Sequence, residues 1–596
     1  MAAAVAAAIS DDGHAVIEAG TGTGKSLAYL VPVALSAKPT IVATATKALQ
    51  DQLANKDLPF VAEHLDTPLE FAVLKGRSNY LCLQRLDELQ TDDTLDLDIS
   101  DSPIKQSTID QLKEFAKTSA TGDRAELDNI SDRDWRLVSV GRDECPGAGR
   151  CPRGDDCLAE KARRKAATAD VLVVNLHLYA LAIMVESILP EHDVVIIDEA
   201  HQLEDIVAEA AGRQISAARV QQCARNASAV LVERDASESA ETAATELHVA
   251  LEPLIGDRLK SGPDEELGRA LDNTRTAVDR VLNALRAVPD TAPPDTKAKA
   301  IRARQMATSL IDDIDAVRWP RDDEVMWIDG PPSNPSLRST PIEVGPLLAE
   351  NLWDNRVGIL TSATLPPKAT ARLGLPSTTA ELDVGSPFDY ESNSLLYCPP
   401  ELPDPRASDF RESQLAEIES LMVAAGGRTL ALFTSFAAMR EAVDKLEGRL
   451  PWPILMQGEG SKNALLREFV EDEPTSLFAT MSFWQGVDAP GSTCRLVIID
   501  RLPFPRPNDP VLQARRDRAG AAAFGQIDLP RAATMLAQGA GRLIRTATDQ
   551  GVVAVLDPRL AKAKSYRWSL INALPPMPRT RERGEAEQFL RQLRDS

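Results

Sequence analysis

Three of the seven cysteines in this 596-residue chain stand within thirteen positions, as Cys145, Cys151 and Cys157. The surrounding stretch, residues 142–157, is rich in Pro, Gly, Arg and Asp, which is typical of a loop and not of an apolar core. Together with Cys82 they form the pattern C-x62-C-x5-C-x5-C, so four thiolates are available to a metal centre. Zinc modules favour two tight cysteine pairs, and this looser spacing favours an iron–sulfur cluster while zinc stays open.

The second chemical pattern is AGTGTGKS, residues 19–26, which lies between an apolar run that predicts a strand and one that predicts a helix. Backbone N–H groups of such a turn, and the N-terminus of the following helix, bind phosphate oxygens. Lys25 is expected to neutralise the β- and γ-phosphates, and the Ser26 hydroxyl to bind Mg²⁺. A glycine-rich turn without a ligand is the alternative. The predicted nucleotide-binding residues here are Gly20, Thr21, Gly22, Thr23, Gly24, Lys25 and Ser26.

The stretch VVIIDEAH, residues 194–201, supplies the carboxylates that a phosphate loop lacks. Asp198 ends an apolar, strand-like run, where its carboxylate can hold Mg²⁺. Glu199 beside it can polarise an attacking water molecule. By itself the stretch also fits the acidic first turn of a helix. Combined with the phosphate loop, it predicts nucleotide hydrolysis.

Three later motifs each have a plain structural explanation when taken alone. Thr361 and Thr364 of TSAT follow an apolar run, where small hydroxyl residues also form turns. Trp484 begins WQGVD, which is compatible with an ordinary turn. Arg542 and Arg545 are three positions apart and share a helix face. That spacing suits surface ion pairs, and it also suits arginines that reach a γ-phosphate from a second domain.

All of these residues need a scaffold, and the sequence predicts an α/β one. Short apolar runs followed by helical patterns occur at 15–35, 39–53, 171–184 and 193–207. This alternation indicates parallel strands joined by crossover helices. The same rhythm resumes from residue 356 and predicts a second α/β lobe.

Two insertions interrupt the first lobe. Residues 77–168 are polar and acidic and contain the clustered cysteines. Residues 206–330 are rich in Ala, Glu and Arg at helical spacing. A β-pair formed by 325–330 and 338–345 is expected to close this second insertion.

Composition and charge set broader bounds. A hydrophobic content of 43% with 26% charged residues is typical of a globular protein, and the length predicts several domains. The net charge of −23 argues against a generally adhesive nucleic-acid binder, although a local basic channel is compatible with it. The longest apolar stretch contains Asn175 and His177 and falls short of a membrane span. We therefore expect a soluble, cytoplasmic protein.

The motifs occur in the order found in superfamily 2 helicases. KGRSNYLC (75–82), the later cysteines and SPFD (386–389) resemble the DinG branch of the XPD-like DNA helicases, and the resemblance covers nearly the whole chain. It implies an α/β fold with two RecA-like parallel-sheet motor lobes, an iron–sulfur insertion and a mostly helical arch insertion. It also implies ATP and Mg²⁺ as cofactors, and a [4Fe–4S] cluster held by Cys82, Cys145, Cys151 and Cys157.

By the same resemblance, we expect an ATP-dependent helicase that moves 5′ to 3′ on single-stranded DNA and unwinds duplex DNA in repair or replication-conflict resolution. Single-stranded and forked DNA are the expected partners, with no membrane, and the expected state is a monomer. The implied domains are motor lobe one at 1–76, 169–205 and 336–370, the cluster domain at 77–168, the arch at 206–335 and motor lobe two at 371–596.

The resemblance also assigns roles to individual residues. Thr46 and Gln52 would contact the DNA backbone. The residues that would couple ATP to movement of the lobes, or would act on the DNA, are His201, Thr361, Thr364 and Trp484. The residues that would face the nucleotide from the second lobe are Asp488, Gln538, Arg542 and Arg545. The predicted catalytic residues are therefore Lys25, Asp198, Glu199, Gln538, Arg542 and Arg545, with Ser26 and Asp198 on Mg²⁺.

Two other classes of function compete with a DNA helicase. An RNA helicase, or a nucleic-acid-stimulated ATPase that does not unwind DNA, would use the same motor, and the cysteine insertion argues against it. A non-enzymatic binder would have lost its NTPase residues, yet Lys25, Asp198, Glu199 and both arginines are intact.

Overall fold

The structure is a computed structural model that describes residues 1–595 apart from Thr21, 92–103, 128–129, Asp143, 186–187, Asp290, Glu473, 481–482 and 485–490. The chain divides into two compact units. One unit comprises Met1–Pro32, Ile197–His201 and Gly358–Ser596, and the other Val33–Ile196 and Gln202–Val357. None of the described helices has the length and apolar content needed to cross a membrane.

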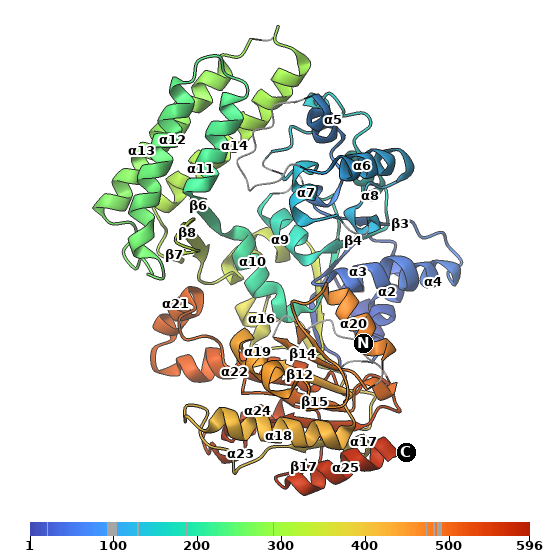
Figure 1. The fold of residues 1–596 in the computed structure, drawn as a ribbon. Coiled ribbons are helices and arrows are strands. Elements are labelled where there is room, and N and C mark those ends of the chain that lie inside the picture. Colours follow the sequence, from blue (N-terminus) through green and yellow to red (C-terminus); the bar gives the residue numbers. More distant parts are fainter. Residues whose placement is uncertain are drawn as a thin grey trace. The chain divides into compact units, whose positions relative to one another are not determined.

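The first sheet carries the motifs from the N-terminal part of the chain (Figure 1). Its strands are β1 (Ala15–Glu18), β2 (Thr40–Thr44), β3 (Phe71–Leu74), β4 (Val171–Asn175), β5 (Val194–Asp198), β9 (Val357–Ser362) and β10 (Ala380–Asp383). They follow the order β10-β1-β9-β5-β2-β4-β3. β1 pairs in parallel with β9 and β10, and β4 pairs in parallel with β2 and β3. The predicted parallel α/β sheet is confirmed.

Helices follow these strands where the sequence predicts them. The apolar stretch 171–184 is strand β4 followed directly by helix α9 (Leu176–Met184). The Asn175 side chain accepts a hydrogen bond from Leu178 N–H at 2.6 Å and so caps the start of α9. The other helices that follow the strands, or precede β1, are α1 (Ala2–Ser10), α2 (Lys25–Ser36), α3 (Lys47–Gln52), α4 (Leu58–Glu63), α10 (Leu203–Ala211), α15 (Gly345–Leu348) and α16 (Ala369–Arg372).

The second sheet is also parallel and lies in the C-terminal part of the chain. Its strands are β11 (Ser394–Tyr397), β12 (Thr429–Phe433), β13 (Ile454–Met456), β14 (Ser476–Thr480), β15 (Leu496–Ile499), β16 (Gly551–Val555) and β17 (Arg579–Thr580). Their order is β13-β14-β12-β15-β16-β11-β17. Together the two sheets form the two α/β lobes that the sequence predicts.

Alternate residues of these strands enter two separate cores, as the two-residue period of a strand requires. Leu430 and Leu432 of β12 face one core, and Ala431 and Phe433 face the other. Because both faces are covered, the strands are almost entirely apolar. One core packs against α18 (Phe410–Ala425), α19 (Phe436–Leu446) and α25 (Arg583–Asp595), and the other against α20 (Lys462–Glu471), α22 (Leu529–Ala540), α23 (Arg559–Lys562) and α24 (Arg567–Asn572).

The cysteine-bearing region folds around a small core. Its helices are α5 (Leu83–Thr91), α6 (Gln106–Thr118), α7 (Asp132–Leu137) and α8 (Leu158–Ala166). The buried side chains that form the core are Leu81, Leu86, Leu112, Phe115, Trp135, Val138 and Leu158. So few apolar residues bury little surface, and domains of this kind usually need a metal or another staple.

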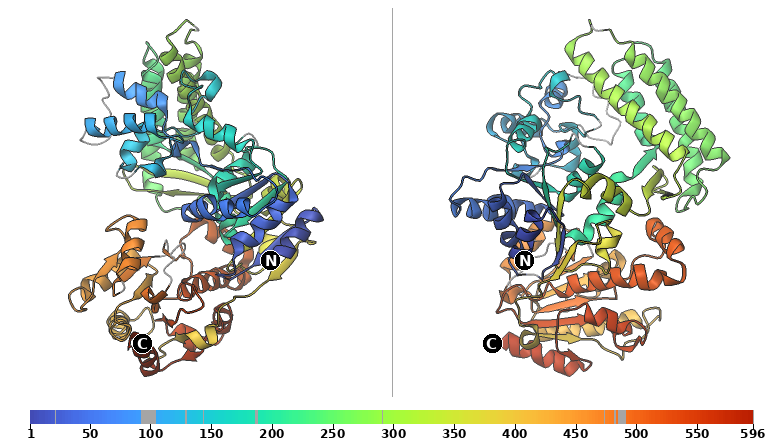
Figure 2. Two further views of the ribbon diagram at one scale, coloured as in Figure 1. Left: turned by 90° about the vertical axis from the view of Figure 1, so that its right-hand side faces the viewer. Right: turned by 180° about the vertical axis from the view of Figure 1, so that it is seen from behind.

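The second insertion is a bundle of four helices that lie side by side in all three views (Figures 1 and 2). The helices are α11 (Ala217–Ser228), α12 (Asp235–Leu251), α13 (Glu265–Arg286) and α14 (Pro294–Arg318). A three-stranded sheet of β6 (Arg213–Ser216), β8 (Ser336–Pro341) and β7 (Glu324–Asp329) stands at its base. β7 and β8 are antiparallel neighbours, so the predicted closing β-pair is confirmed.

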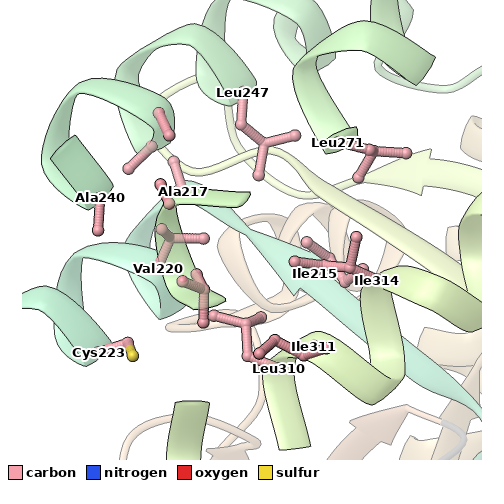
Figure 3. Close-up of a cluster of buried hydrophobic side chains, with 14 of the residues drawn as sticks. Ile215, Ala217, Val220, Cys223, Ala240, Leu247, Leu271, Leu310, Ile311 and Ile314 are labelled. Carbon is pink, nitrogen blue, oxygen red and sulfur yellow. The ribbon is translucent and has the colours of Figure 1, made fainter. Parts of the chain in front are cut away.

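The bundle has its own apolar core, and Figure 3 shows how the side chains converge from several helices. Leu247 of α12, Leu271 of α13 and Leu310 of α14 are all fully buried there. Buried positions recur every three or four residues along each helix, which is the signature of an amphipathic helix.

Replacement of Leu247 by Ala should therefore lower the stability of the bundle by about 2–5 kcal/mol, because it leaves a cavity in this core. Hydrogen exchange of the whole protein would measure the effect as faster exchange throughout α11–α14. Val249 lies on the same helix and is exposed. Val249→Ala is the matched control and should leave exchange unchanged. Equal protection in both variants would contradict a cooperative bundle core.

Candidate nucleotide site and cysteine cluster

The phosphate loop connects β1 to α2, and its glycines adopt conformations that other residues avoid. Gly22 and Gly24 have φ angles of 76° and 71°, in the left-handed region that favours glycine. Lys25 and Ser26 follow at the first two positions of α2. The backbone N–H groups at the start of this helix are available to phosphate oxygens. Thr21 lies outside the described residues.

One hydrogen bond within the loop and one to the sheet hold the loop in place. Thr23 Oγ1 donates to the carbonyl oxygen of Gly20 at 2.9 Å. The N–H of Ala19 donates to the carbonyl oxygen of Ser362, the last residue of β9, at 2.9 Å. The loop is therefore shaped by its own contacts.

Asp198 is the last residue of β5, and its carboxylate is buried. Tyr29 Oη donates to Asp198 Oδ2 at 3.0 Å, and Glu199 N–H donates to Oδ1 at 2.9 Å. Burial raises the pKa of Asp198 to about 6, and the charge of Glu199 adds to this, whereas Lys25 and Tyr29 lower it. A buried carboxylate with this deficit of positive charge suits a divalent cation.

Glu199 is held in a hydrogen-bonded group with His201 and Ser362. His201 Nδ1 lies 2.9 Å from Ser362 Oγ and 3.3 Å from Glu199 Oε2. Ser362 Oγ also donates to Glu199 Oε2 at 3.4 Å. The φ angle of Glu199 is 59°, an uncommon value for a residue with a side chain, and such strain is concentrated at functional sites. These contacts join the DEAH motif to the TSAT motif.

The charges around Glu199 keep it ionised. Burial opposes its ionisation, but the hydrogen bond with His201 and the charges of Lys25 and Arg542 lower its pKa overall. Arg542 and Arg545 both lie beyond the end of helix α22 at Ala540, so the predicted shared helix face is wrong. Arg542 Nε donates to the carbonyl oxygen of Trp484 at 2.7 Å. Residues that the sequence analysis took from three separate motifs therefore lie within electrostatic reach of one another: Lys25, Asp198, Glu199, His201 and Arg542.

The other predicted residues of this site occupy different environments. The hydroxyls of Thr361 and Thr364 are buried and have no hydrogen-bond partner in the described part of the chain. Trp484 packs in a core beneath the second sheet. The backbone N–H of Arg545 donates to Asp549 Oδ2 at 2.6 Å. Of the remaining two, Gln538 is buried on α22, and Asp488 lies outside the described residues.

Thr46 and Gln52, predicted to contact DNA, bracket helix α3. Thr46 Oγ1 accepts from Leu49 N–H at 3.2 Å and caps the start of the helix. Gln52 Nε2 donates to Asp57 Oδ2 at 2.9 Å.

Sequence reasoning missed Tyr29, which donates a hydrogen bond to the buried Asp198. Tyr29 stands four residues after Lys25, so the two share one face of α2. A polar residue one turn beyond the phosphate-loop lysine was the available signal. Its partner Asp198 lies 169 positions away, so the sequence alone could not indicate which residue Tyr29 contacts.

The four predicted cysteines line one cavity of the cysteine-bearing region. Cys82, Cys145, Cys151 and Cys157 all contribute to its wall. Burial raises the pKa of Cys82 to about 11, and the other three thiols add to this effect. Burial also raises the pKa of Cys151, again with contributions from its neighbours. Thiolates this close repel one another unless a cationic centre binds them.

The loop that bears three of these cysteines is tightly folded. Gly154 N–H donates to the carbonyl oxygen of Cys151 at 2.9 Å. A Cβ atom added to Gly154 would stand 2.0 Å from the carbonyl oxygen of Ala148, so this position needs glycine.

Two arginines approach the cysteine cavity. Arg77 Nη1 donates to Cys145 Sγ at 3.5 Å and also pairs with Glu160. Arg302, from helix α14 of the bundle, lines the same cavity and lowers the pKa of Cys151 against the larger effect of burial. Its Nη2 also donates to both carboxylate oxygens of Glu88 on α5, at 2.8 and 2.9 Å. Arg302 thus joins the two insertions next to the sulfurs.

The four sulfurs line a common cavity. Within the described residues, no three His, Cys, Asp or Glu side chains are grouped as ligands of one metal ion.

The site combines a phosphate loop, two adjacent carboxylates and Arg542, which follows helix α22. These groups on two parallel α/β lobes define a phosphate-loop NTPase of the motor type. Known proteins narrow this class. A family model described as a helicase C-terminal domain matches residues 418–577. The ATP-dependent helicase DinG of Mycobacterium tuberculosis is 39% identical over 631 residues, covering 100% of this chain and 94% of the relative.

Two further similarities agree with this match. The ATP-dependent DNA helicase YoaA of Escherichia coli is 35% identical over 619 residues, covering 99% of this chain and 95% of the relative. A solved structure of an XPD helicase superposes with a TM-score of 0.61 at 16% identity, covering 97% of this chain and 98% of the other. The chain therefore belongs to the DinG and YoaA family of ATP-dependent helicases, and its fold is that of XPD.

The bridge through Ser362 generates a prediction about coupling. Ser362→Ala removes the hydroxyl that contacts both His201 and Glu199, while Lys25 and Asp198 keep their places. ATP hydrolysis should fall less than about threefold, whereas strand displacement per ATP should fall at least about tenfold. The two rates are measured on the same preparation. An equal loss of ATP hydrolysis and strand displacement would contradict a coupling role. Lys25→Ala should lose both activities and is the reference for a variant without ATP hydrolysis.

Proposed function

We propose that this chain is a monomeric, ATP-driven DNA helicase that moves 5′ to 3′ along single-stranded DNA and opens forked duplexes. The observation that carries the proposal is the convergence of Lys25, Asp198, Glu199 and Arg542 on one site. Membership in the DinG and YoaA family supports the class of reaction. The direction of travel and the preference for forks rest on the family resemblance.

In the proposed reaction, the residues of the phosphate loop bind the phosphates of ATP, and the two carboxylates hold Mg²⁺ and orient the attacking water. Lys25 neutralises phosphate charge, and the backbone N–H groups after Gly24 hold the phosphate oxygens. Ser26 and Asp198 would hold Mg²⁺, which supplies charge neutralisation at the phosphates. Glu199 orients and polarises the attacking water, and its lowered pKa keeps it in the ionised form that this role needs.

Arg542 is the proposed sensor of the γ-phosphate. Its charge already acts on Glu199, so it lies where negative charge develops during hydrolysis. Gln538, Arg545 and Asp488 are also proposed to face the nucleotide. His201, Thr361 and Thr364 are proposed to couple ATP hydrolysis to movement of the lobes. Two buried hydroxyls with no partner among the described residues suit a relay, because they can gain hydrogen bonds in a second state.

A motor is needed because each base-pair step of duplex DNA costs on the order of 1.4 kcal/mol to open. We propose that Thr46 and Gln52 belong to the track along which the strand moves. Trp484, which the sequence also suggested for this role, is fully buried in the core beneath the second sheet, so a direct contact with the strand is not proposed for it. A groove between the cysteine loop and helix α14 offers further phosphate contacts. Its walls include three arginines, Arg142, Arg150 and Arg304, together with Asp312 and Asp313, so positive side chains outnumber negative ones by one on a chain of net charge −23.

We further propose that Cys82, Cys145, Cys151 and Cys157 hold a [4Fe–4S] cluster. Their common cavity and the repulsion among their thiols support this assignment. A bound cluster would staple a region whose own apolar core is small. The stapled region would stand at the fork and part the strands.

Strand displacement on forked DNA tests the activity and its direction together. With ATP and Mg²⁺, a substrate with only a 5′ single-stranded tail should be opened, and one with only a 3′ tail should not. Displacement from the 3′ tail alone would overturn the proposed direction. ATP hydrolysis stimulated more by RNA than by DNA, without displacement, would favour the alternative of an RNA-dependent remodeller.

Glu199→Gln should bind ATP but lose at least about a hundredfold in hydrolysis.

Cys151→Ser tests the cluster. The wild-type protein purified without oxygen should be brown and contain about four iron atoms per chain, and the variant should lose both the colour and the iron. Strand displacement should fall with them, while ATP binding remains. Cys223→Ala is the matched control, because Cys223 is buried in the helical bundle away from the cavity. A colourless wild-type protein with one zinc ion would contradict the assignment.

A further inference from the structure

The short segment that follows β10, residues 384–389, runs directly beside the phosphate loop. Val384 N–H donates to the carbonyl oxygen of Glu18 at 2.9 Å. Gly20 N–H donates to the carbonyl oxygen of Gly385 at 3.0 Å. The chain then enters helix α17 (Tyr390–Asn393) and strand β11 of the second sheet. One continuous segment therefore links the nucleotide loop to the second sheet.

Phe388 makes the closest approach to the loop. A Cβ atom placed on Gly22 would stand 2.0 Å from Cζ of the Phe388 ring and 2.6 Å from its Cε2. The tip of the ring is therefore pressed against the backbone of Gly22. At Gly20 an added Cβ would likewise meet the Gly385 carbonyl oxygen at 3.0 Å. Both loop glycines are needed here for close packing, in addition to the backbone angle at Gly22.

The other side of Phe388 belongs to the second sheet. The ring packs against the core formed there by the strands and helices α20 and α22. It meets the Tyr390 ring edge to face, with centroids 6.4 Å apart and planes at 68°, and Tyr390 is buried. Such a T-shaped pair is a favoured aromatic geometry. A single side chain thus touches both the phosphate loop and the core of the second sheet.

The segment has a defined local structure. Gly385 N–H donates to Asp383 Oδ1 at 2.8 Å, and Phe388 N–H donates to Ser386 Oγ at 3.3 Å. Asp389 Oδ1 accepts from Ser392 N–H at 3.0 Å and caps the start of α17. Side-chain hydrogen bonds of this kind fix turns. The ring of Phe388 is consequently held from both sides along the chain.

We propose that Phe388 is a positioning residue for the phosphate loop: it holds Gly22 in the conformation that binds nucleotide and transmits changes in the loop to the second sheet. The inference rests on the proposed ATP-driven function and adds a contact outside the recognised motifs. Loss of the ring leaves Lys25, Ser26 and the carboxylates in place. It should therefore weaken nucleotide binding without removing the groups that carry out hydrolysis.

The test measures binding and hydrolysis separately in the full-length protein. Phe388→Ala should raise the Kd for a fluorescent ADP analogue and the KM for ATP about three- to tenfold, the range expected for loss of one aromatic contact. The kcat at saturating ATP should change less than about twofold. Phe388→Leu, which keeps part of the apolar contact, should lie between. Phe60→Ala is the control, since Phe60 is an exposed phenylalanine on α4, and it should match the wild type.

A double-mutant cycle locates the effect at Gly22. Gly22→Ala should weaken nucleotide binding strongly in the wild type and at least about threefold less in the Phe388→Ala background, because the added methyl then meets no ring. The strain from the backbone angle is the same in both backgrounds and cancels.

Purely additive losses, or tighter nucleotide binding by Phe388→Ala, would overturn the proposal. If the wild type itself neither binds nor hydrolyses ATP, the proposed function fails instead. If Phe388→Ala does not fold, as judged by circular dichroism, the cycle is run with Phe388→Leu, for which additivity with Gly22→Ala would again be decisive.

Discussion

The interaction on which the motor site depends is the compensation of two adjacent carboxylates, the buried Asp198 and the partly buried Glu199, by cations from distant parts of the chain. Asp198 is buried at a strand end, and burial raises its pKa. Its neighbour Glu199 stays ionised because His201, Lys25 and Arg542 act on it together. A buried charge without such partners costs several kcal/mol, so the fold can keep this pair only if the strands and loops deliver those partners. The parallel sheets do so, since the carboxyl ends of their strands and the loops that follow gather at one edge.

A second constraint acts on the cysteine-bearing region and the helical bundle. The bundle has a large apolar core of its own, whereas the cysteine-bearing region has a small one. The former is therefore stable through packing, and the latter has less apolar packing of its own. The two regions meet through Arg302 and Glu88, a pair with little exposure to solvent. This ion pair thus joins a region with a large core to a region with a small one.

Much of the fold and part of the site could be predicted from the sequence. Apolar runs of the β12 and β16 type fix parallel strands, and Lys25 and Asp198 were recognisable because phosphate and Mg²⁺ demand particular groups at particular offsets. The contacts that escaped prediction join residues far apart in the chain, such as Arg302 with Glu88, 214 positions apart. Neither residue stands in a recognisable motif. Phe388 was noticed only as part of SPFD, because a ring pressed against a glycine leaves no local pattern.

The salt bridge between Arg302 and Glu88 bears on how such proteins can be recombined. The two residues lie in separate insertions, yet Arg302 also lines the cavity of the four cysteines. A chimera that exchanged the bundle alone would leave Glu88 without its strongest cationic partner, with Gln84 and Arg85 of its own helix beside it, and one that exchanged the cysteine-bearing region alone would leave Arg302 facing foreign sulfurs. The two insertions are consequently best exchanged together, although the two residues of this ion pair stand 214 positions apart in the sequence.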